Sequence, residues 1–206
     1  MTDDSWPEDV FERLYKTNPD PWGFQTSAYE RAKYGETLAA LGSRRFRFVL
    51  EFGCSIGVMT EALAPSCDRL LGIDIAETAL ELARVRCAAH AQVAFRRCRL
   101  PDEFPALEPG SVDLILISEL LYFLSPADNA RLAAEALRVL APDGMVVLVN
   151  WTGDTNTPCT GDEAAQLFVQ SCVDAGLAVT LGRRPDTYRL DRLERGPGGQ
   201  EGVGSA

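Results

Sequence analysis

The sequence predicts an α/β fold: a doubly wound, mostly parallel sheet of seven strands with an antiparallel C-terminal edge hairpin, preceded by two N-terminal helices. Three observations support this prediction. From residue 46 onward, short apolar runs alternate with helical segments, which is typical of parallel strands joined by crossover helices. The last two apolar runs have no helix between them, as expected of an antiparallel edge. Two helical segments precede the first run.

The N-terminal region is predicted to be helical with one break. Residues 6–41 have a helical pattern that Asn18-Pro19-Asp20-Pro21-Trp22 interrupts, because proline cannot continue a helix. Ser27 is a candidate N-cap for the second helix, expected over 29–41, and Gly42 follows its end. The expected strands are 46–52, 70–73, 93–96, 112–117, 145–150, 178–182 and 187–190. The helices between them are expected at 58–64, 77–89, 126–140 and 162–175.

The length of 206 residues suits one domain. We predict a single domain over residues 1–195, with a helical cap at 1–42 and the sheet at 46–195. Residues 196–206 are rich in glycine, and we expect them to be a disordered tail. Hydrophobic residues make up 46% and charged residues 24% of the chain, which is ordinary for a globular protein.

Composition excludes several partners. A net charge of −10 argues against nucleic acid, because neutralising phosphates needs clustered Lys and Arg. The Arg-rich residues 183–195 also contain acids, and we interpret them as a solvated mixed-charge surface. With one histidine and no C-x-x-C pair among six cysteines, no metal is expected, and the thiols are read as reduced. Without a long apolar run or a secretory signal, no membrane partner is expected and a cytoplasmic location follows by default.

A glycine loop and an acid mark the candidate ligand site. The first strand is followed at once by Gly53-Cys54-Ser55-Ile56-Gly57 and then by a helix, and Asp74 ends the second strand. Glycines let the backbone turn sharply and approach a ligand closely. Both loops open at the carboxyl edge of neighbouring strands, where a carboxylate can accept both hydroxyls of a ribose. The loop alone could serve only turn geometry, and Asp74 alone could cap the next helix.

A dinucleotide is a poor fit to these residues. Its fingerprint is G-x-G-x-x-G, with the pyrophosphate on the helix N-terminus. Here position 55 is serine and position 58 is valine. Glu51, two residues before the loop, would crowd a pyrophosphate but could pair with a cationic amino-acid group. The residues therefore favour a nucleoside that carries an amino acid.

These residues resemble the first two motifs of the class I S-adenosylmethionine-dependent methyltransferase family, whose fold is a Rossmann-like sheet. The resemblance covers about residues 46–182. It implies S-adenosylmethionine as cofactor, with the glycine loop around the methionine part, the acid on the ribose and the end of the third strand beside adenine. The implied cofactor-binding residues are Glu51, Gly53, Cys54, Ser55, Gly57, Asp74, Ile75, Arg99, Leu100, Pro101 and Ser118. One departure concerns the adenine contact, because the acid often found near position 98 is Cys98 or Arg99 here.

A narrower resemblance, spanning nearly the whole chain, is to the nodulation protein S (NodS-like) group. It rests on Leu14-Tyr15, Asp20-Pro-Trp22, Ser27-x-Tyr29-Glu30, Lys33-Tyr34, residues 51–57, Ser118-Glu-Leu-Leu-Tyr122 and Tyr188-Arg-Leu-Asp191. It implies N-methylation of an amino group on a sugar, the type example being a deacetylated chitooligosaccharide. Where a His-Trp pair is expected after the fifth strand, this chain has Asn150-Trp151, so the acceptor here can differ.

The acceptor is expected to meet the cofactor beyond the fourth strand. Glu119 and Tyr122 follow that strand and are the candidate catalytic residues, since a carboxylate or tyrosine can bind an ammonium group and take its proton. Glu119 could instead simply begin a helix. Candidate substrate-binding residues, which stack on a sugar or fence the sulfonium, are Trp22, Tyr29, Tyr34 and Trp151; each could equally be a core residue.

Two other functions stay open. One is an O- or N-methyltransferase acting on a non-sugar small molecule, which Asn150 keeps plausible. The other is a non-catalytic S-adenosylmethionine-binding partner subunit. Hydrolytic triad chemistry is disfavoured, because His90 precedes the third strand and so lies at the sheet end opposite the predicted site. The sequence does not indicate the oligomeric state or the number of methyl groups transferred.

Overall fold

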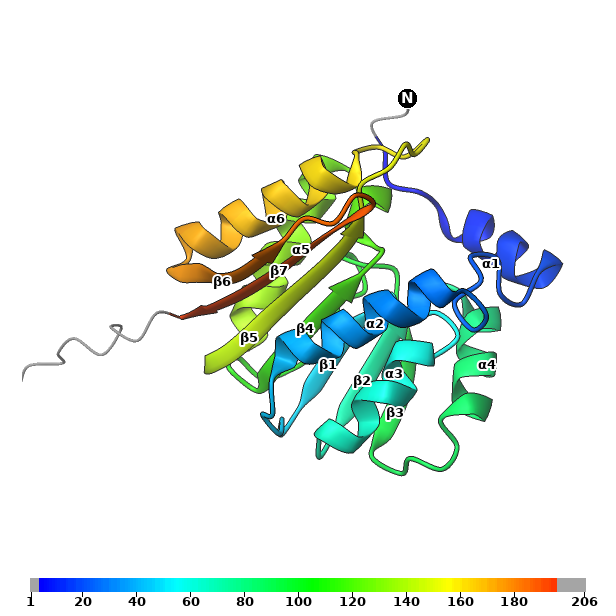
Figure 1. The fold of residues 1–206 in the computed structure, drawn as a ribbon, viewed down its shortest axis with the longest axis horizontal. Helices are drawn as coiled ribbons and strands as arrows, with labels where there is room; N and C mark the ends of the chain where they lie inside the picture. The colour runs from blue at the N-terminus through cyan, green and yellow to red at the C-terminus, as the bar shows by residue number, and fades with distance from the viewer. Residues whose placement is uncertain (1–3, 196–206) are drawn as a thin grey trace, which may run out of the picture.

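A computed structural model describes residues 4–195 as one seven-stranded sheet with helices on both faces (Figure 1). The strand order is β3-β2-β1-β4-β5-β7-β6. The first five strands in this order are mutually parallel, and β7 is antiparallel to both β5 and β6. The predicted α/β class, the strand count and the antiparallel C-terminal edge are confirmed. The predicted disordered tail, 196–206, lies outside the described residues.

The elements follow the predicted order. The strands are β1 Val49–Phe52, β2 Leu70–Asp74, β3 Val93–Arg97, β4 Val112–Ser118, β5 Leu140–Trp151, β6 Leu177–Arg183 and β7 Tyr188–Arg195. The α-helices are α1 Glu8–Thr17, α2 Ala28–Leu41, α3 Val58–Leu63, α4 Glu77–Arg86, α5 Pro126–Val139 and α6 Gly161–Asp174. Two single 3₁₀ turns occur, η1 Ala64–Ser66 and η2 Leu121–Phe123.

Local capping explains where the helices begin. The Ser27 side chain accepts a hydrogen bond from the backbone N–H of Glu30, and Gly42 follows α2 with a φ of 69°, so both predicted ends of this helix are confirmed. Ser125 caps α5 in the same way. Thr160 and Glu163 form a reciprocal capping box at the start of α6, which satisfies two backbone N–H groups that have no partner within the helix.

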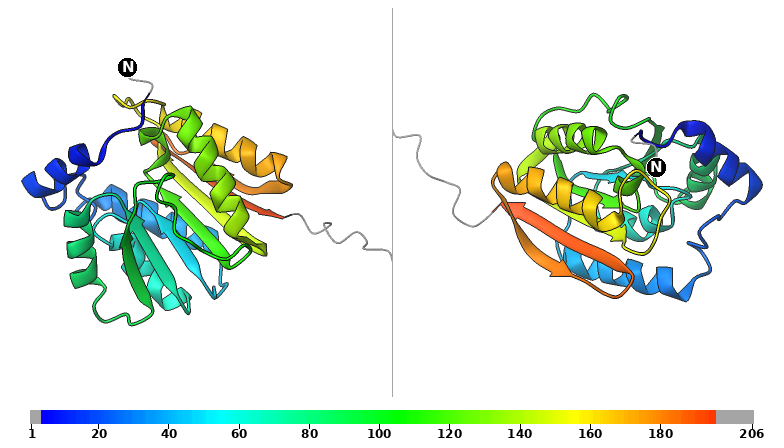
Figure 2. Two further views of the ribbon diagram at one scale, coloured as in Figure 1. Left: turned by 180° about the vertical axis from the view of Figure 1, so that it is seen from behind. Right: turned by 90° about the horizontal axis from the view of Figure 1, so that it is seen from above.

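The core forms two layers, one on each face of the sheet. On one face α5 and α6 pack against β4 and β5 through residues such as Leu132, Phe168 and Leu148. On the other face α2 and α3 pack through Leu41, Met59 and neighbouring side chains. Figure 2 shows the face that α5 and α6 cover. The loops at the carboxyl ends of the parallel strands all lie along one edge of the sheet, where α/β folds build their ligand sites.

The first strand is shorter than predicted. It begins at Val49 rather than at residue 46, and Phe46 makes only an isolated bridge to Cys67. The carboxylate of Asp113 accepts the backbone N–H groups of Arg47 (2.9 Å) and Phe48 (2.8 Å). A side chain thus replaces the neighbouring strand as the hydrogen-bond partner at this end, which a hydrophobicity pattern does not reveal.

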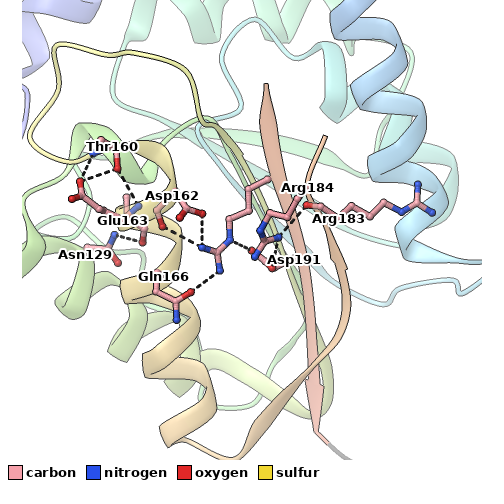
Figure 3. A network of polar contacts seen from close by, with 10 residues as sticks. Asn129, Thr160, Asp162, Glu163, Gln166, Arg183, Arg184 and Asp191 are labelled. Carbon is pink, nitrogen blue, oxygen red and sulfur yellow. Dashed lines mark hydrogen bonds and ion pairs between the residues drawn. The ribbon is translucent and has the colours of Figure 1, made fainter. Parts of the chain in front are cut away.

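The interpretation of residues 183–195 as a solvated mixed-charge surface is wrong for two of them. β7 lies inside the sheet, and Arg189 and Asp191 are 3% and 1% exposed. The Arg189 guanidinium pairs with Asp191, Asp162 (2.8 Å) and the side chain of Gln166 (2.9 Å) (Figure 3). Because each buried charge has a partner, an arginine-rich segment can form an interior strand.

The membrane, cysteine, metal and histidine features can be stated for residues 4–195. Over residues 4–195, no helix is both long and apolar enough to cross a membrane. All six cysteines are buried free thiols, and the described part of the chain contains no group of three or more His, Cys, Asp or Glu arranged to hold a metal ion. His90 lies just before β3, at the amino end of that strand.

Candidate active site

A cavity of about 880 Å³ lies at the carboxyl ends of the parallel strands, under α1 and α2. This volume is in the range of sites that enclose a small-molecule ligand. One part of its wall, the glycine-loop side, is formed after β1, β2 and β3 by Glu51, Gly53, Cys54, Ser55, Asp74, Ile75, Arg99 and Leu100. The other part, the α2 side, is formed by Trp22, Tyr29, Glu30, Lys33, Tyr34, Ser118, Glu119, Tyr122 and Trp151.

The glycine-loop side is built by a turn that requires glycine. Gly53 has a φ of 73°, and a Cβ there would lie 3.2 Å from the Ser118 backbone oxygen. The backbone N–H groups of Gly53 and Cys54 both donate to the Ile73 carbonyl, at 2.8 and 3.0 Å. These bonds fix the loop after β1 against the end of β2, so the two predicted ligand-binding segments lie side by side.

Asp74 ties the two segments together. Its carboxylate accepts the backbone N–H of Ser55 (2.8 Å) at one oxygen and that of Ala76 (2.9 Å) at the other. The side chain is buried, which raises its pKa against the lowering effect of these N–H groups. Each carboxylate oxygen has a second lone pair, so Asp74 can hold the loop and still accept two hydroxyl groups from a ligand in the cavity.

Helix α1 covers the glycine-loop side of the cavity. The hydroxyls of Tyr15 and Ser55 lie 2.5 Å apart, and Glu12 accepts both the backbone N–H and the hydroxyl of Thr78 at the start of α4. Tyr15 is 3% exposed. The N-terminal cap therefore contributes directly to the wall of the site, which the sequence had suggested only through the family resemblance.

Glu51 is a buried carboxyl group on the cavity wall. One of its oxygens accepts a hydrogen bond from the Thr60 hydroxyl at 2.6 Å. Burial raises the pKa of Glu51 to about 8, with a further contribution from the negative charge of Asp74 and an opposing one from Thr60. A cationic group placed beside Glu51 would favour the ionised carboxylate, so the position suits the ammonium of an amino acid.

The α2 side contains a charged network in which the predicted site residue Glu119 joins Lys33 and Glu30, two residues that the sequence did not assign to the site. Lys33 is 2% exposed and donates to Glu119 (2.5 Å) and to Glu30 (3.0 Å). Glu119 also accepts the Tyr122 hydroxyl and the Trp151 backbone N–H, each at 2.8 Å. Burial by itself lowers the pKa of Lys33, but the carboxylates of Glu119 and Glu30 outweigh it and the pKa is raised. Lys33 therefore stays a cation.

Strained backbone occurs at two points of this wall. Among the described residues, Ser55 (φ 50°) and Glu119 (φ 55°) are the non-glycine residues with positive φ. Such conformations cost energy and persist where surrounding contacts hold them, often at functional sites. Glu119 directly precedes the loop into η2 and is not the first residue of a helix, so its place reflects the network rather than a helix N-terminus.

Most of the predicted site residues meet in this cavity. Those that do not line it are Gly57 and Pro101. Gly57 has a φ of 78°, and a Cβ there would come within 3.0 Å of the Ala83 Cβ, so this glycine allows α3 and α4 to pack closely. Asn150 also lies away from the cavity wall, fully buried near the start of α6. Its difference from the expected histidine therefore carries no direct information about the acceptor.

A sequence model of the nodulation protein S (NodS) family matches residues 7–157. The chain belongs to the NodS family. The nodulation protein S of Bradyrhizobium diazoefficiens is 35% identical over 132 residues, covering 62% of this chain and 61% of that protein. The nodulation protein S of Rhizobium tropici is 34% identical over 130 residues, covering 62% of this chain and 53% of that protein. A ubiquinone biosynthesis O-methyltransferase of Thiobacillus denitrificans is 27% identical over 140 residues, 68% of this chain and 54% of that protein.

Solved structures share the fold of this NodS-family chain. The N-methyltransferase NodS from Bradyrhizobium japonicum WM9, in complex with S-adenosylhomocysteine, has a TM-score of 0.78 at 23% identity and covers 91% of this chain and 97% of that one. A putative methyltransferase from Pseudomonas syringae has a TM-score of 0.71 at 33% identity, with coverages of 82% and 100%. The alignments with the curated NodS proteins span less than two thirds of those relatives' length.

The raised pKa of Glu51 predicts how the stability of this NodS-family protein depends on pH. The folded state binds a proton up to about pH 8, whereas the unfolded chain releases it near pH 4.5, so the stabilisation is present below pH 4.5 and is lost as the pH rises to about 8. A shift of this size corresponds to on the order of 4–5 kcal/mol. Glu51→Gln mimics the protonated form and should remove this loss.

Thermal unfolding without ligand measures the effect. Between pH 5 and pH 8, which spans most of this loss, the melting temperature of the wild type should fall by roughly 7–14 °C more than that of Glu51→Gln. Glu61→Gln, at an exposed carboxylate on α3, is the matched control and should follow the wild type. Parallel curves for wild type and Glu51→Gln would contradict the prediction.

Proposed function

We propose that this NodS-family protein is an S-adenosylmethionine-dependent methyltransferase that N-methylates an amino group of an amino sugar or of a saccharide-containing metabolite. One observation carries the proposal. In a single cavity, one wall carries the glycine loop and Asp74, whose carboxylate is placed to accept ribose hydroxyls. The other wall carries aromatic and acidic side chains. Membership of the NodS family supports it, as does the fold shared with the N-methyltransferase from Bradyrhizobium japonicum WM9.

The glycine-loop side is proposed to hold S-adenosylmethionine. Asp74 has spare acceptor capacity for the ribose hydroxyls, and Glu51 is placed to pair with the methionine ammonium. Gly53 lacks the Cβ that would crowd this wall. Ile75, Arg99 and Leu100, beyond β2 and β3, are proposed to flank adenine. When bound, the cofactor supplies a methyl group whose carbon–sulfur bond breaks as an acceptor lone pair forms the new bond, the electron pair passing to sulfur.

The α2 side is proposed to hold the acceptor. Trp22, Tyr29, Tyr34 and Trp151 offer aromatic faces on which a sugar ring can stack, and Tyr29 and Trp151 meet edge to face with ring centroids 6.0 Å apart. Two carboxylates and one ammonium, from Glu30, Glu119 and Lys33, leave this wall with one net negative charge. Such a wall attracts an ammonium group and repels a carboxylate. The chain's contribution to rate is mainly to align the acceptor nitrogen in a dry site.

Methyl transfer from labelled S-adenosylmethionine to a panel of acceptors tests the function. The panel is a glucosamine tetramer, its fully N-acetylated counterpart, a catechol and an aliphatic carboxylic acid, with products identified by mass spectrometry. We expect label only on the free-amine oligomer.

Two outcomes would favour other functions. Label on the catechol would support an O-methyltransferase, a candidate that the similarity to the O-methyltransferase of Thiobacillus denitrificans keeps open. Bound cofactor without product from any acceptor would support a non-catalytic partner subunit.

A further inference from the structure

Among the described residues, the carboxylate of Glu30, on the α2 side of the cavity, receives a single hydrogen bond. The residue is 8% exposed and lines the cavity. Lys33 Nζ lies 3.0 Å from both carboxylate oxygens, but hydrogen-bond geometry is met only at Oε1. Oε2 is buried and has no hydrogen-bond partner. A carboxylate has about four acceptor positions, so Glu30 keeps capacity for a further donor beyond the Lys33 ammonium.

The other acid on this side of the cavity, Glu119, already receives three hydrogen bonds. One oxygen of Glu119 receives Lys33, and the other receives both the Tyr122 hydroxyl and the Trp151 backbone N–H. These three donors fix the position of the carboxylate and leave it little room for a hydrogen bond from an acceptor. Glu119 therefore suits orientation of the network better than proton transfer.

The remaining charged and titratable neighbours of Glu30 do not donate a further hydrogen bond to it. On its own helix the charged and titratable groups are Lys33 and Tyr34, and from outside come Glu119 and Asp20. Asp20 is occupied by the backbone N–H groups of Phe24 (2.8 Å) and Gln25 (3.0 Å). Lys33 cannot serve as a base, since its ammonium is held between two carboxylates.

We propose that Glu30 binds the ammonium group of the acceptor through its carboxylate and removes the proton that blocks the attacking nitrogen. This inference rests on the proposed function and names the group that selects amines at that site. The proton passes from the acceptor ammonium to the Glu30 carboxylate, which leaves a neutral amine with a free lone pair and a carboxylic acid. After methyl transfer the product carries the new cationic nitrogen, and Glu30 returns its proton to solvent.

Electrostatics supports this role. Burial raises the pKa of Glu30, and Lys33 opposes that rise. A carboxyl group with a raised pKa is a better match to the task of taking a proton from an ammonium than an exposed one. The net negative charge of the network also disfavours an anionic acceptor, which separates amine substrates from carboxylic acids.

Glu30→Gln tests the proposal, because glutamine keeps the size of the side chain and can still accept a bond from Lys33. We expect kcat/KM for the glucosamine tetramer to fall roughly 100-fold, while S-adenosylhomocysteine binds with an affinity within twofold of wild type. Glu36→Gln is the matched control: Glu36 is a half-buried residue of the same helix that pairs with Arg183 outside the cavity. It should retain wild-type kcat/KM.

Binding measured by calorimetry in the presence of S-adenosylhomocysteine gives a readout besides turnover. Wild type should bind the glucosamine tetramer at least tenfold more tightly than its N-acetylated counterpart, and Glu30→Gln should lose this preference. Glu30→Asp, which keeps the charge, should retain part of the preference for the free-amine tetramer. If Glu30→Gln does not fold, Glu30→Asp still tests the role of residue 30.

Three results would overturn the proposal: unchanged kcat/KM in Glu30→Gln, an equal loss of cofactor affinity, or turnover by wild type of hydroxyl or carboxyl acceptors alone. Turnover of hydroxyl or carboxyl acceptors alone would still support methyltransferase activity and would reject only the proposal that the acceptor is an amine. Cofactor binding with no product from any acceptor would reject the proposed function itself, and the inference with it.

Discussion

Asp74→Ala should weaken the binding of S-adenosylhomocysteine by about 100-fold, measured by calorimetry. The carboxylate holds the glycine loop through the Ser55 N–H and braces the start of α4 through the Ala76 N–H. Its removal therefore takes away two proposed bonds to the ribose and loosens the loop that receives the ligand. Hydrogen bonds to a charged group contribute about 1.5–3 kcal/mol each, and roughly 3 kcal/mol corresponds to this loss of affinity.

Asp113→Ala is a closely matched control. Asp113 is 2% exposed and, like Asp74, accepts two backbone N–H groups, but it lies at the opposite end of the sheet. Both variants lose a buried carboxylate with similar partners, so both should unfold at lower temperature. Only Asp74→Ala should lose ligand affinity. Equal affinities in the two folded variants would show that Asp74 has only a structural role.

Glu119→Gln should lower both stability and turnover while leaving cofactor affinity nearly unchanged. The carboxylate receives three donors from Lys33, Tyr122 and Trp151, and a glutamine amide offers only one oxygen and would point an N–H group at a donor. Leaving buried donors unsatisfied costs about 2–3 kcal/mol, or roughly 5–10 °C in melting temperature for a chain of this length. Turnover should fall about tenfold or more as Lys33 and the acceptor wall lose their positions.

Tyr122→Phe separates the contributions within this network. It removes one of the three donors and no charge, so a loss of about 1 kcal/mol is expected. Differential scanning calorimetry and single-turnover methyl transfer measure the two effects for both variants. A Glu119→Gln variant with the melting temperature and rate of the wild type would remove Glu119 from the functional site.

Much of the fold was predictable because its determinants are local. The apolar runs, the N-cap of α2 and the glycine after it act over a few residues, and the structure confirms them. The predictions were wrong where a side chain distant in the sequence determines the local structure. Asp113 accepts the backbone N–H groups of Arg47 and Phe48, so β1 begins later than predicted. Buried pairing lets Arg189 lie within an interior strand. Neither partner is visible in a local window of sequence.

The candidate site divides in the same way. On the glycine-loop side, each segment carries its own signal: a glycine turn after one strand and an acid at the end of the next. On the α2 side the signal was ambiguous. Glu30, Lys33 and Thr37 recur at helical spacing along one stripe of α2 and are all buried. A polar stripe on a helix usually faces water, so the sequence alone does not indicate that these side chains point into the protein.

By itself the sequence determined the alternation of strands and helices, and through it the edge of the sheet at which a ligand binds, because parallel strands bring their carboxyl ends to the same side. It also determined the residues of the glycine loop and Asp74. Only the tertiary structure decided that Lys33 lies between Glu30 and Glu119, although Glu119 is 86 positions away from it in the sequence. It also decided that Glu30 receives one hydrogen bond and Glu119 three. These are properties of long-range contacts, since the state of a buried charge depends on which other charges the fold brings within a few ångströms of it.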